Sequence, residues 1–131
     1  MNVTWVDWET LLTTSDILSL HAPATAQTRH VLDGAALRRM RRGSYLINTA
    51  RGPLVDEAAL VEVLHEGHLA GAGLDVYERE PAVHPGLLDI PSAVLLPHIG
   101  SATPRTRESM ATLAARNVRA VLSGNAPLTP V

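Results

Sequence analysis

The hydrophobic positions of this chain form four short apolar runs, which are separated by segments with helical spacing. A short run that is bounded by proline, glycine or polar residues is typical of a buried strand. The pattern therefore predicts strands over residues 17–21, 44–48, 69–76 and 93–96, with a weaker strand signal over residues 3–6. Residues 8–14 have the pattern of a short helix or turn.

Three further segments carry helix signals. Asp33 is a candidate N-cap before residues 35–40, and Gly43 is a candidate C′ residue. Asp56 is a candidate N-cap for a helix that places Glu57 near its positive end and stops at Gly67. The sequence Thr103-Pro104 predicts the start of a long last helix. The apolar positions at helical spacing are Ala59, Leu60, Val63 and Leu64 in the second helix, and Met110, Leu113, Ala114, Val118, Val121 and Leu122 in the last.

The alternation of strands and helices predicts an α/β fold with a parallel sheet. We interpret it as the C-terminal half of a Rossmann-type doubly wound parallel sheet, followed by a long C-terminal helix. The glycine-rich first turn of such a sheet is not found, because Gly71-Ala72-Gly73 lacks a third glycine and continues as strand. These small residues are expected to let a helix pack closely on the sheet.

We expect one partial domain over residues 1–131. It would comprise the strand and helix alternation over residues 1–103, the long helix over residues 104–123, and a tail over residues 124–131 that leaves the domain surface.

Composition narrows the classes of protein. Phe is absent and aromatic residues are 3%, so the core must be aliphatic. A formal charge of −2 gives no reason to expect nucleic acid as a partner. The run Arg38, Arg39, Arg41 and Arg42 fits a solvated helix face better than a phosphate contact, since no aromatic residues are interleaved for base stacking. Without cysteine, the chain has no disulfide, no thiolate zinc site and no cysteine nucleophile.

Location follows from what the sequence does not contain. No basic segment with an apolar core opens the chain, and no apolar run approaches the ~20 residues that span a bilayer. We expect a cytoplasmic protein with no membrane partner.

Arg51 is the first candidate functional residue, because it follows the run 44–48 within three residues. In open α/β sheets the ligand crevice lies outside the carboxyl ends of the strands. An arginine there can hold a carboxylate through two parallel hydrogen bonds. The alternative is a structural arginine that pairs with Asp56 or Glu57.

Two other strand ends carry polar groups, namely Asp75 with Glu80, and His98. Histidine exchanges protons near neutral pH, and a carboxylate on its other nitrogen would favour the protonated form. With Arg51 to hold an acid substrate, the set suits the reduction of a 2-oxo acid by a nicotinamide. His21 also ends a strand, where a loop-capping role is as plausible as a chemical one.

These residues lie in motifs that resemble the D-isomer-specific 2-hydroxyacid dehydrogenases, such as the phosphoglycerate, D-lactate and glyoxylate/hydroxypyruvate enzymes. The resemblance covers nearly the whole chain. The matching motifs are His21-Ala22-Pro23, Thr28-Arg29-His30, Asn48-Thr49-Ala50-Arg51-Gly52, Val55-Asp56-Glu57, Ala70-Gly71-Ala72-Gly73-Leu74-Asp75-Val76, Glu80-Pro81 and Pro97-His98-Ile99-Gly100-Ser101-Ala102-Thr103.

The resemblance implies a role for each catalytic position. Arg51 would bind the substrate carboxylate and polarise the carbonyl, Glu80 would raise the basicity of the histidine, and His98 would exchange the proton. It also implies NAD as cofactor, with NADP possible. The cofactor would be lined by Ala22 and Pro23 on the adenosine side, by Thr49, Ala50 and Arg51, by Asp75 near the carboxamide, and by His98, Ile99, Gly100 and Ser101.

Similar proteins also have an N-terminal substrate region and the glycine-rich half, which are missing here. We therefore expect weak NAD binding and no turnover by the isolated chain. We also expect self-association through an unpaired sheet edge, or pairing with the missing N-terminal part. The alternative function is a non-catalytic NAD-binding or dimerisation module of the corepressor type. His30 is expected to have a structural role in its loop, and no metal site is expected from His65 and His68.

Overall fold

The computed structural model describes residues 3–130. The chain divides into two compact units, Met1–His98 and Ile99–Val131, and each is described by itself.

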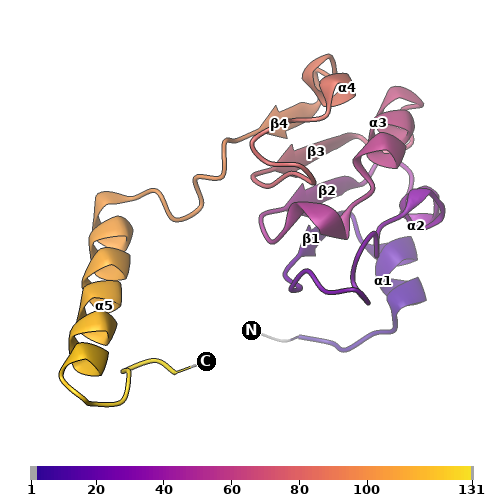
Figure 1. Cartoon of the computed structure of the whole chain (residues 1–131). Helices are drawn as coiled ribbons and strands as arrows, with labels where there is room; N and C mark the ends of the chain where they lie inside the picture. Colours follow the sequence, from indigo (N-terminus) through magenta and orange to yellow (C-terminus); the bar gives the residue numbers. More distant parts are fainter. Residues whose placement is uncertain (1–2, 131) are drawn as a thin grey trace. The chain divides into compact units, whose positions relative to one another are not determined.

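The first unit is built on a sheet of four strands in the order β1-β2-β3-β4 (Figure 1). These strands are β1 (Ile17–Leu20), β2 (Tyr45–Asn48), β3 (Gly71–Leu74) and β4 (Ala93–Leu95). Every neighbouring pair is parallel, and Ile17, Tyr45 and Gly71 share one register position. The four predicted strands and the α/β fold class are confirmed.

The first helix of this unit precedes β1, and the others lie between successive strands. The helices are α1 (Trp8–Thr14), α2 (Gly34–Arg39), α3 (Glu57–His65) and the short α4 (Pro85–Leu88), with a 3₁₀ turn, η1, over Gly52–Leu54. The predicted caps are confirmed, because the side chain of Asp33 accepts from Ala36 N and that of Asp56 from Ala59 N. Each cap satisfies a helix N–H that has no partner within its own helix.

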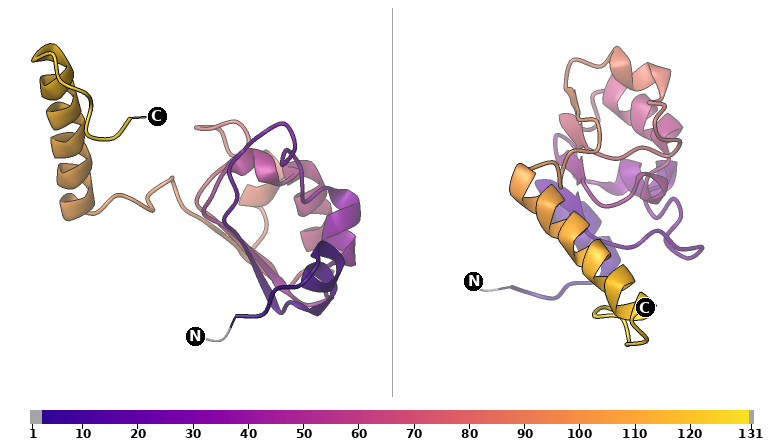
Figure 2. Two further views of the ribbon diagram at one scale, coloured as in Figure 1. Left: turned by 90° about the horizontal axis from the view of Figure 1, so that it is seen from below. Right: turned by 60° about the vertical axis from the view of Figure 1, so that its left-hand side comes forward.

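One face of the sheet carries the helices, as the left view of Figure 2 shows for α1, α2 and α3. A strand order without reversals, with right-handed crossovers, places every connecting helix on the same side. The strand side chains alternate accordingly: Leu18 and Leu46 are buried, whereas Ile17 and Tyr45 are exposed. The other face therefore leaves apolar side chains open within this unit.

The core between the sheet and the helices is aliphatic, as the composition predicts. The fully buried large side chains are Leu12, Leu32, Leu37, Leu46, Leu54, Leu60, Leu69, Leu87, Val55, Val63 and Val76, together with Asn48. Leu60, Val63 and Leu64 form the buried face of α3, as predicted, while Ala59 packs against the core at its margin.

Several local predictions were wrong. Residues 3–6 form no strand, and α4 was not predicted. Gly43 adopts φ 81° but lies in the turn before β2, since Met40 is the C-cap of α2. Within the first unit, the atoms nearest the β3 glycines do not belong to a helix: a Cβ on Gly71 would meet Ser92 O at 2.6 Å, and one on Gly73 would meet the Ile47 side chain at 3.1 Å.

The arginine run forms ion pairs on the surface of the first unit. Arg38 Nη2 lies 2.6 Å from Glu66 Oε1, Arg41 Nη1 lies 2.6 Å from Asp16 Oδ1, and Arg39 pairs with Glu9. These contacts agree with the interpretation as a solvated face. Among residues 3–130, no helix has the length and hydropathy needed to cross a membrane.

The second unit contains α5 (Pro104–Leu122), which confirms the predicted long helix, and Thr103 caps it by accepting from Thr106 N. The tail does not simply leave this unit, as we had expected. Leu128 N–H donates to Asn117 Oδ1 at 2.7 Å, so the tail returns along α5.

Strand β2, which lies between β1 and β3, is expected to contribute strongly to the stability of the first unit. L46A removes a side chain that is 0% exposed and should lower the free energy of unfolding by about 2–5 kcal/mol. I17A, on the open face and 64% exposed, is the matched control and should change it by less than about 1 kcal/mol. Urea denaturation followed by circular dichroism measures both. Equal effects of the two variants would contradict the assignment of the faces.

Candidate active site

The site lies where the four strands reach their carboxyl ends. Because the strands are parallel, the segments that follow Leu20, Asn48, Leu74 and Leu95 emerge at one edge of the sheet. These segments carry the residues that the sequence singles out.

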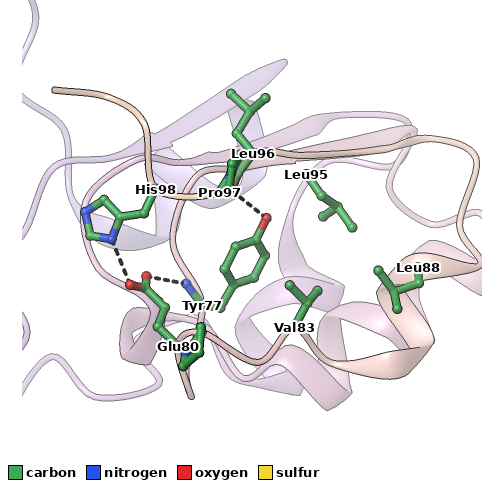
Figure 3. A pocket seen from close by; sticks show the side chains of 9 residues that line it. Tyr77, Glu80, Val83, Leu88, Leu95, Leu96, Pro97 and His98 are labelled. Carbon is green, nitrogen blue, oxygen red and sulfur yellow. Dashed lines mark hydrogen bonds and ion pairs between the residues drawn. The ribbon is translucent and has the colours of Figure 1, made fainter. Parts of the chain in front are cut away.

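His98 and Glu80 form a direct pair. His98 Nδ1 lies 2.8 Å from Glu80 Oε2, and Glu80 Oε1 accepts from the backbone N–H of Tyr77 at 3.0 Å (Figure 3). Both Glu80 oxygens therefore have a partner, which fixes the carboxylate. The histidine ring is half exposed, with 50% of its side chain accessible, and its Nε2 is not engaged by this pair.

The contact with His98 stabilises the ionised form of the Glu80 carboxyl group. The hydrogen bond from His98, followed by the one from Tyr77 N–H, lowers the pKa of Glu80 below its ordinary value. The charges of His98 and Arg51 lower the pKa of Glu80 further. A carboxylate that stays ionised is suited to orient and stabilise an imidazolium.

Tyr77 holds the loop that carries Glu80. Its hydroxyl donates to Leu96 O at 2.8 Å, which ties this loop to the end of β4 just before His98. Beside the pair lies a mainly apolar cavity of about 280 Å³, whose lining includes Tyr77, Leu88 and Leu96 (Figure 3). The sequence interpretation missed Tyr77, because its contact with Leu96 O, 19 positions away, leaves no local signal.

The Arg51 loop is shaped by Asn48 at the end of β2. The buried Asn48 amide donates to Arg51 O at 2.9 Å, and its Oδ1 accepts from Ala50 N at 3.1 Å. The Arg51 guanidinium donates to Ala50 O at 2.7 Å. The structural alternative, a pairing with Asp56 or Glu57, is not among the contacts in the described part of the chain.

A second cavity brings together the residues predicted to border a dinucleotide. Its volume is about 470 Å³, and Ala22, Pro23, Ala50 and Arg51 line it. His21 and Ala24 line it too, and the sequence interpretation did not include them in the site. Small side chains at two adjacent strand ends leave room for a flat ligand, so these residues fit part of a dinucleotide.

The other residues predicted to contact the cofactor do not line this second cavity. Thr49 follows β2 and is exposed, while Asp75 follows β3 and is buried, with its N–H donating to Asn48 O at 3.0 Å. Ile99, Gly100 and Ser101 belong to the second unit, in which Ala102 N–H donates to Ile99 O. Their contact with a cofactor stays a prediction. Within the described chain, no group of three or more metal-binding side chains occurs.

Comparison with known proteins now identifies the chain's family. Residues 1–100 match the family model described as "D-isomer specific 2-hydroxyacid dehydrogenase, NAD binding domain". The chain belongs to this family. The resemblance inferred from the motifs, the NAD-binding assignment and the Rossmann-like fold are thereby confirmed.

Relatives and solved structures agree with the family. Glyoxylate reductase from Thermofilum pendens is 52% identical over 128 residues, which cover 96% of this chain and 38% of the relative. The crystal structure of the TT0316 protein from Thermus thermophilus matches with a TM-score of 0.92 and 50% sequence identity. The match covers 96% of this chain and 40% of that one. The NADPH-dependent glyoxylate/hydroxypyruvate reductase of Sinorhizobium meliloti, in complex with NADP and malonate, is 42% identical with a TM-score of 0.90, over 95% and 39%. The chain thus spans about two fifths of these proteins.

The hydrogen bond between His98 and Glu80 should be visible in the titration of Glu80. Replacing His98 by Gln removes the largest cause of the lowered pKa of Glu80, so that pKa should rise toward its ordinary value. In the wild type, the stabilisation that Glu80 contributes is present at neutral pH and lost as the pH falls through its lowered pKa. Carbon-13 NMR titration of the Glu80 carboxyl measures this, with H65Q on α3 as control. An unchanged Glu80 pKa in H98Q would contradict the pairing.

Proposed function

We propose that this chain is part of an NAD(P)-dependent enzyme that reduces a small 2-oxo acid to the D-2-hydroxy acid. The observation that carries the proposal is the 2.8 Å contact between His98 and Glu80, at the sheet edge that also presents Arg51. The names of the relatives, which include glyoxylate and glyoxylate/hydroxypyruvate reductases, support the substrate class.

In this proposal His98 is the acid and base. Glu80 binds Nδ1, so Nε2 faces the reacting group and exchanges the proton. During reduction His98 gives that proton to the carbonyl oxygen, and Glu80 stabilises the imidazolium that precedes the transfer. During oxidation of the hydroxy acid the proton returns to Nε2.

Arg51 is the proposed anchor for the substrate. Its guanidinium suits the planar carboxylate of a 2-oxo acid through paired hydrogen bonds, and its charge polarises the neighbouring carbonyl. The nicotinamide, when bound, supplies or accepts the hydride. To the cofactor as a whole we assign Ala22 and Pro23 on the adenosine side, together with Thr49, Ala50, Arg51, Asp75 and His98. The family resemblance adds Ile99, Gly100 and Ser101 of the second unit.

We further propose that the isolated chain binds NAD weakly and does not turn over. About three fifths of the length of the relatives lies outside this chain, and a doubly wound fold binds the pyrophosphate at its glycine-rich first turn. The sequence of this chain does not supply that turn.

A chimera tests the catalytic roles. Residues 1–131 would replace the matching part of the Thermofilum pendens enzyme, which is 52% identical. We expect the chimera to reduce glyoxylate with NADH or NADPH, and the 131-residue chain alone to show no turnover. In the chimera, H98Q should lower kcat by about 10²–10⁴-fold, because it removes the general acid. R51K should raise the KM for glyoxylate, since a lysine cannot form the paired contact.

The matched control in the chimera is H65Q, which changes the last residue of α3. It should leave kcat and KM unchanged. If H98Q kept the kcat of the unmodified chimera, the acid and base role would be wrong.

The open face of the sheet favours a second candidate function, that of a module that associates with another chain. Ile17, Tyr45 and Val94 are 64%, 49% and 62% exposed on or beside this face. Parallel sheets are normally covered on both faces. We propose that the isolated chain associates with itself, or with the part of the relatives that it lacks.

Light scattering tests the association. The apparent mass of the 131-residue chain should rise with concentration, because association buries apolar surface. The double change I17S/V94S should lower the concentration dependence, whereas L88S, on a residue of α4 that is 66% exposed, serves as control. A monomer across a wide concentration range would contradict this proposal and leave the catalytic one standing.

A further inference from the structure

His30 contacts both of the loops that carry the proposed catalytic residues. Its backbone N–H donates to Pro53 O at 2.8 Å, in η1, which directly follows Arg51. Its ring Nε2 lies 2.6 Å from Glu78 Oε1, two residues before Glu80. One residue thus links the Arg51 loop to the Glu80 loop.

Glu78 is itself anchored at the start of α3. The N–H of Glu78 donates to Glu57 Oε1 at 2.8 Å, and the N–H of Glu57 lies 3.4 Å from Glu78 Oε2. Glu57 is only 6% exposed, and its burial raises the pKa of its carboxyl group. Arg29 Nη2 lies 3.5 Å from Glu78 Oε1 from the solvent side, with 59% of its side chain exposed. The Glu78 carboxylate therefore has partners from two separate segments.

The backbone conformations point to the same loop. Among the described residues, only His30 and His98 are non-glycine residues with positive φ, at 48° and 53°. Such a conformation is uncommon for residues with a side chain and persists where the surroundings hold it. Each of these histidines pairs with a glutamate of the Tyr77–Pro81 segment, Glu78 for His30 and Glu80 for His98.

The two loops also pack directly on one another. A Cβ on Gly52 would overlap the backbone of Tyr77 and Glu78, so glycine is required where the Arg51 loop meets the Glu80 loop. Because the two loops are in contact here, a bond that holds one loop also constrains the position of the other.

We propose that His30 is a positioning residue: with Glu78 it fixes the spacing between Arg51 and the Glu80–His98 pair. The importance of this spacing for catalysis rests on the proposed function. The contacts that set the spacing are formed between residues of this chain. His30 acts through Glu78 and Pro53, and it does not touch the reacting atoms.

Glu80 is a suitable reporter. The His98 hydrogen bond, then the Tyr77 hydrogen bond, and further the Arg51 charge lower the pKa of Glu80. His98 and Arg51 lie outside the Glu80 loop and so report its position, whereas the Tyr77 hydrogen bond lies within the loop and reports its order. The test measures this pKa by carbon-13 NMR in the 131-residue chain, together with hydrogen exchange of the Tyr77 amide, which donates to Glu80.

The variants are E78A and H30N, with E78Q as the conservative change and R29A as control. Asparagine tolerates positive φ and keeps the bond to Pro53, but its shorter side chain does not reach Glu78. E78Q keeps an acceptor for His30 and for Glu57 N–H. Removing the negative charge of Glu78 would by itself lower the pKa of Glu80, which is opposite to the effect of lost positioning.

We expect the pKa of Glu80 to rise in E78A and H30N, and the Tyr77 amide to exchange about tenfold faster, as for the loss of one charge-assisted hydrogen bond. E78Q and R29A should exchange at the wild-type rate. Wild-type exchange at Tyr77 and no rise of the Glu80 pKa in folded E78A and H30N would overturn the proposal. If E78A does not fold, exchange in H30N decides alone. These measurements need no turnover, so a failed chimera would not affect them.

Discussion

Parallel pairing of four short strands is the constraint on which the first unit depends. The strands follow one another in chain order, so each connection crosses over in the same hand and each helix lies on the same face. The same order brings all four carboxyl ends to one edge. The position of Arg51 after β2 and that of His98 after β4 are therefore consequences of topology before any side-chain contact forms.

Local contacts then convert this edge into a defined site. Asn48 shapes the Arg51 loop, Tyr77 ties the Glu80 loop to the end of β4, and Glu80 holds the ring of His98. Each contact is a hydrogen bond between segments that the sheet has already brought close. The proposed chemistry would draw on a fixed carboxylate, an oriented imidazole and a guanidinium from this chain.

One face of the sheet is covered by helices, and the other is open within this unit. This asymmetry agrees with a chain that spans about two fifths of the proteins it matches. Leu18 and Leu46 are buried under the helices, while Ile17 and Tyr45 are exposed. The two compared proteins are more than twice as long as this chain. The open apolar face is the observation on which the association proposal rests, and the strand ends of the same sheet carry the residues of the catalytic proposal.

The sequence by itself determined the elements and their order, because apolar runs, caps and glycines act over a few residues. It located the four strands, the caps Asp33, Asp56 and Thr103, and the candidates Arg51, Glu80 and His98. It misjudged residues 3–6, where β-branched and aromatic residues have no partner strand, and α4, whose single turn is too short for a periodic signal.

Only the tertiary structure decided which long-range partners these residues have. Within the first unit, the β3 glycines accommodate Ser92 and Ile47, and His30 pairs with Glu78, 48 positions away. Such contacts depend on the register of strands and on how two loops pack, which local pattern does not encode. The physical reason is that a hydrogen bond across the sheet edge is specified by the geometry of several elements at once.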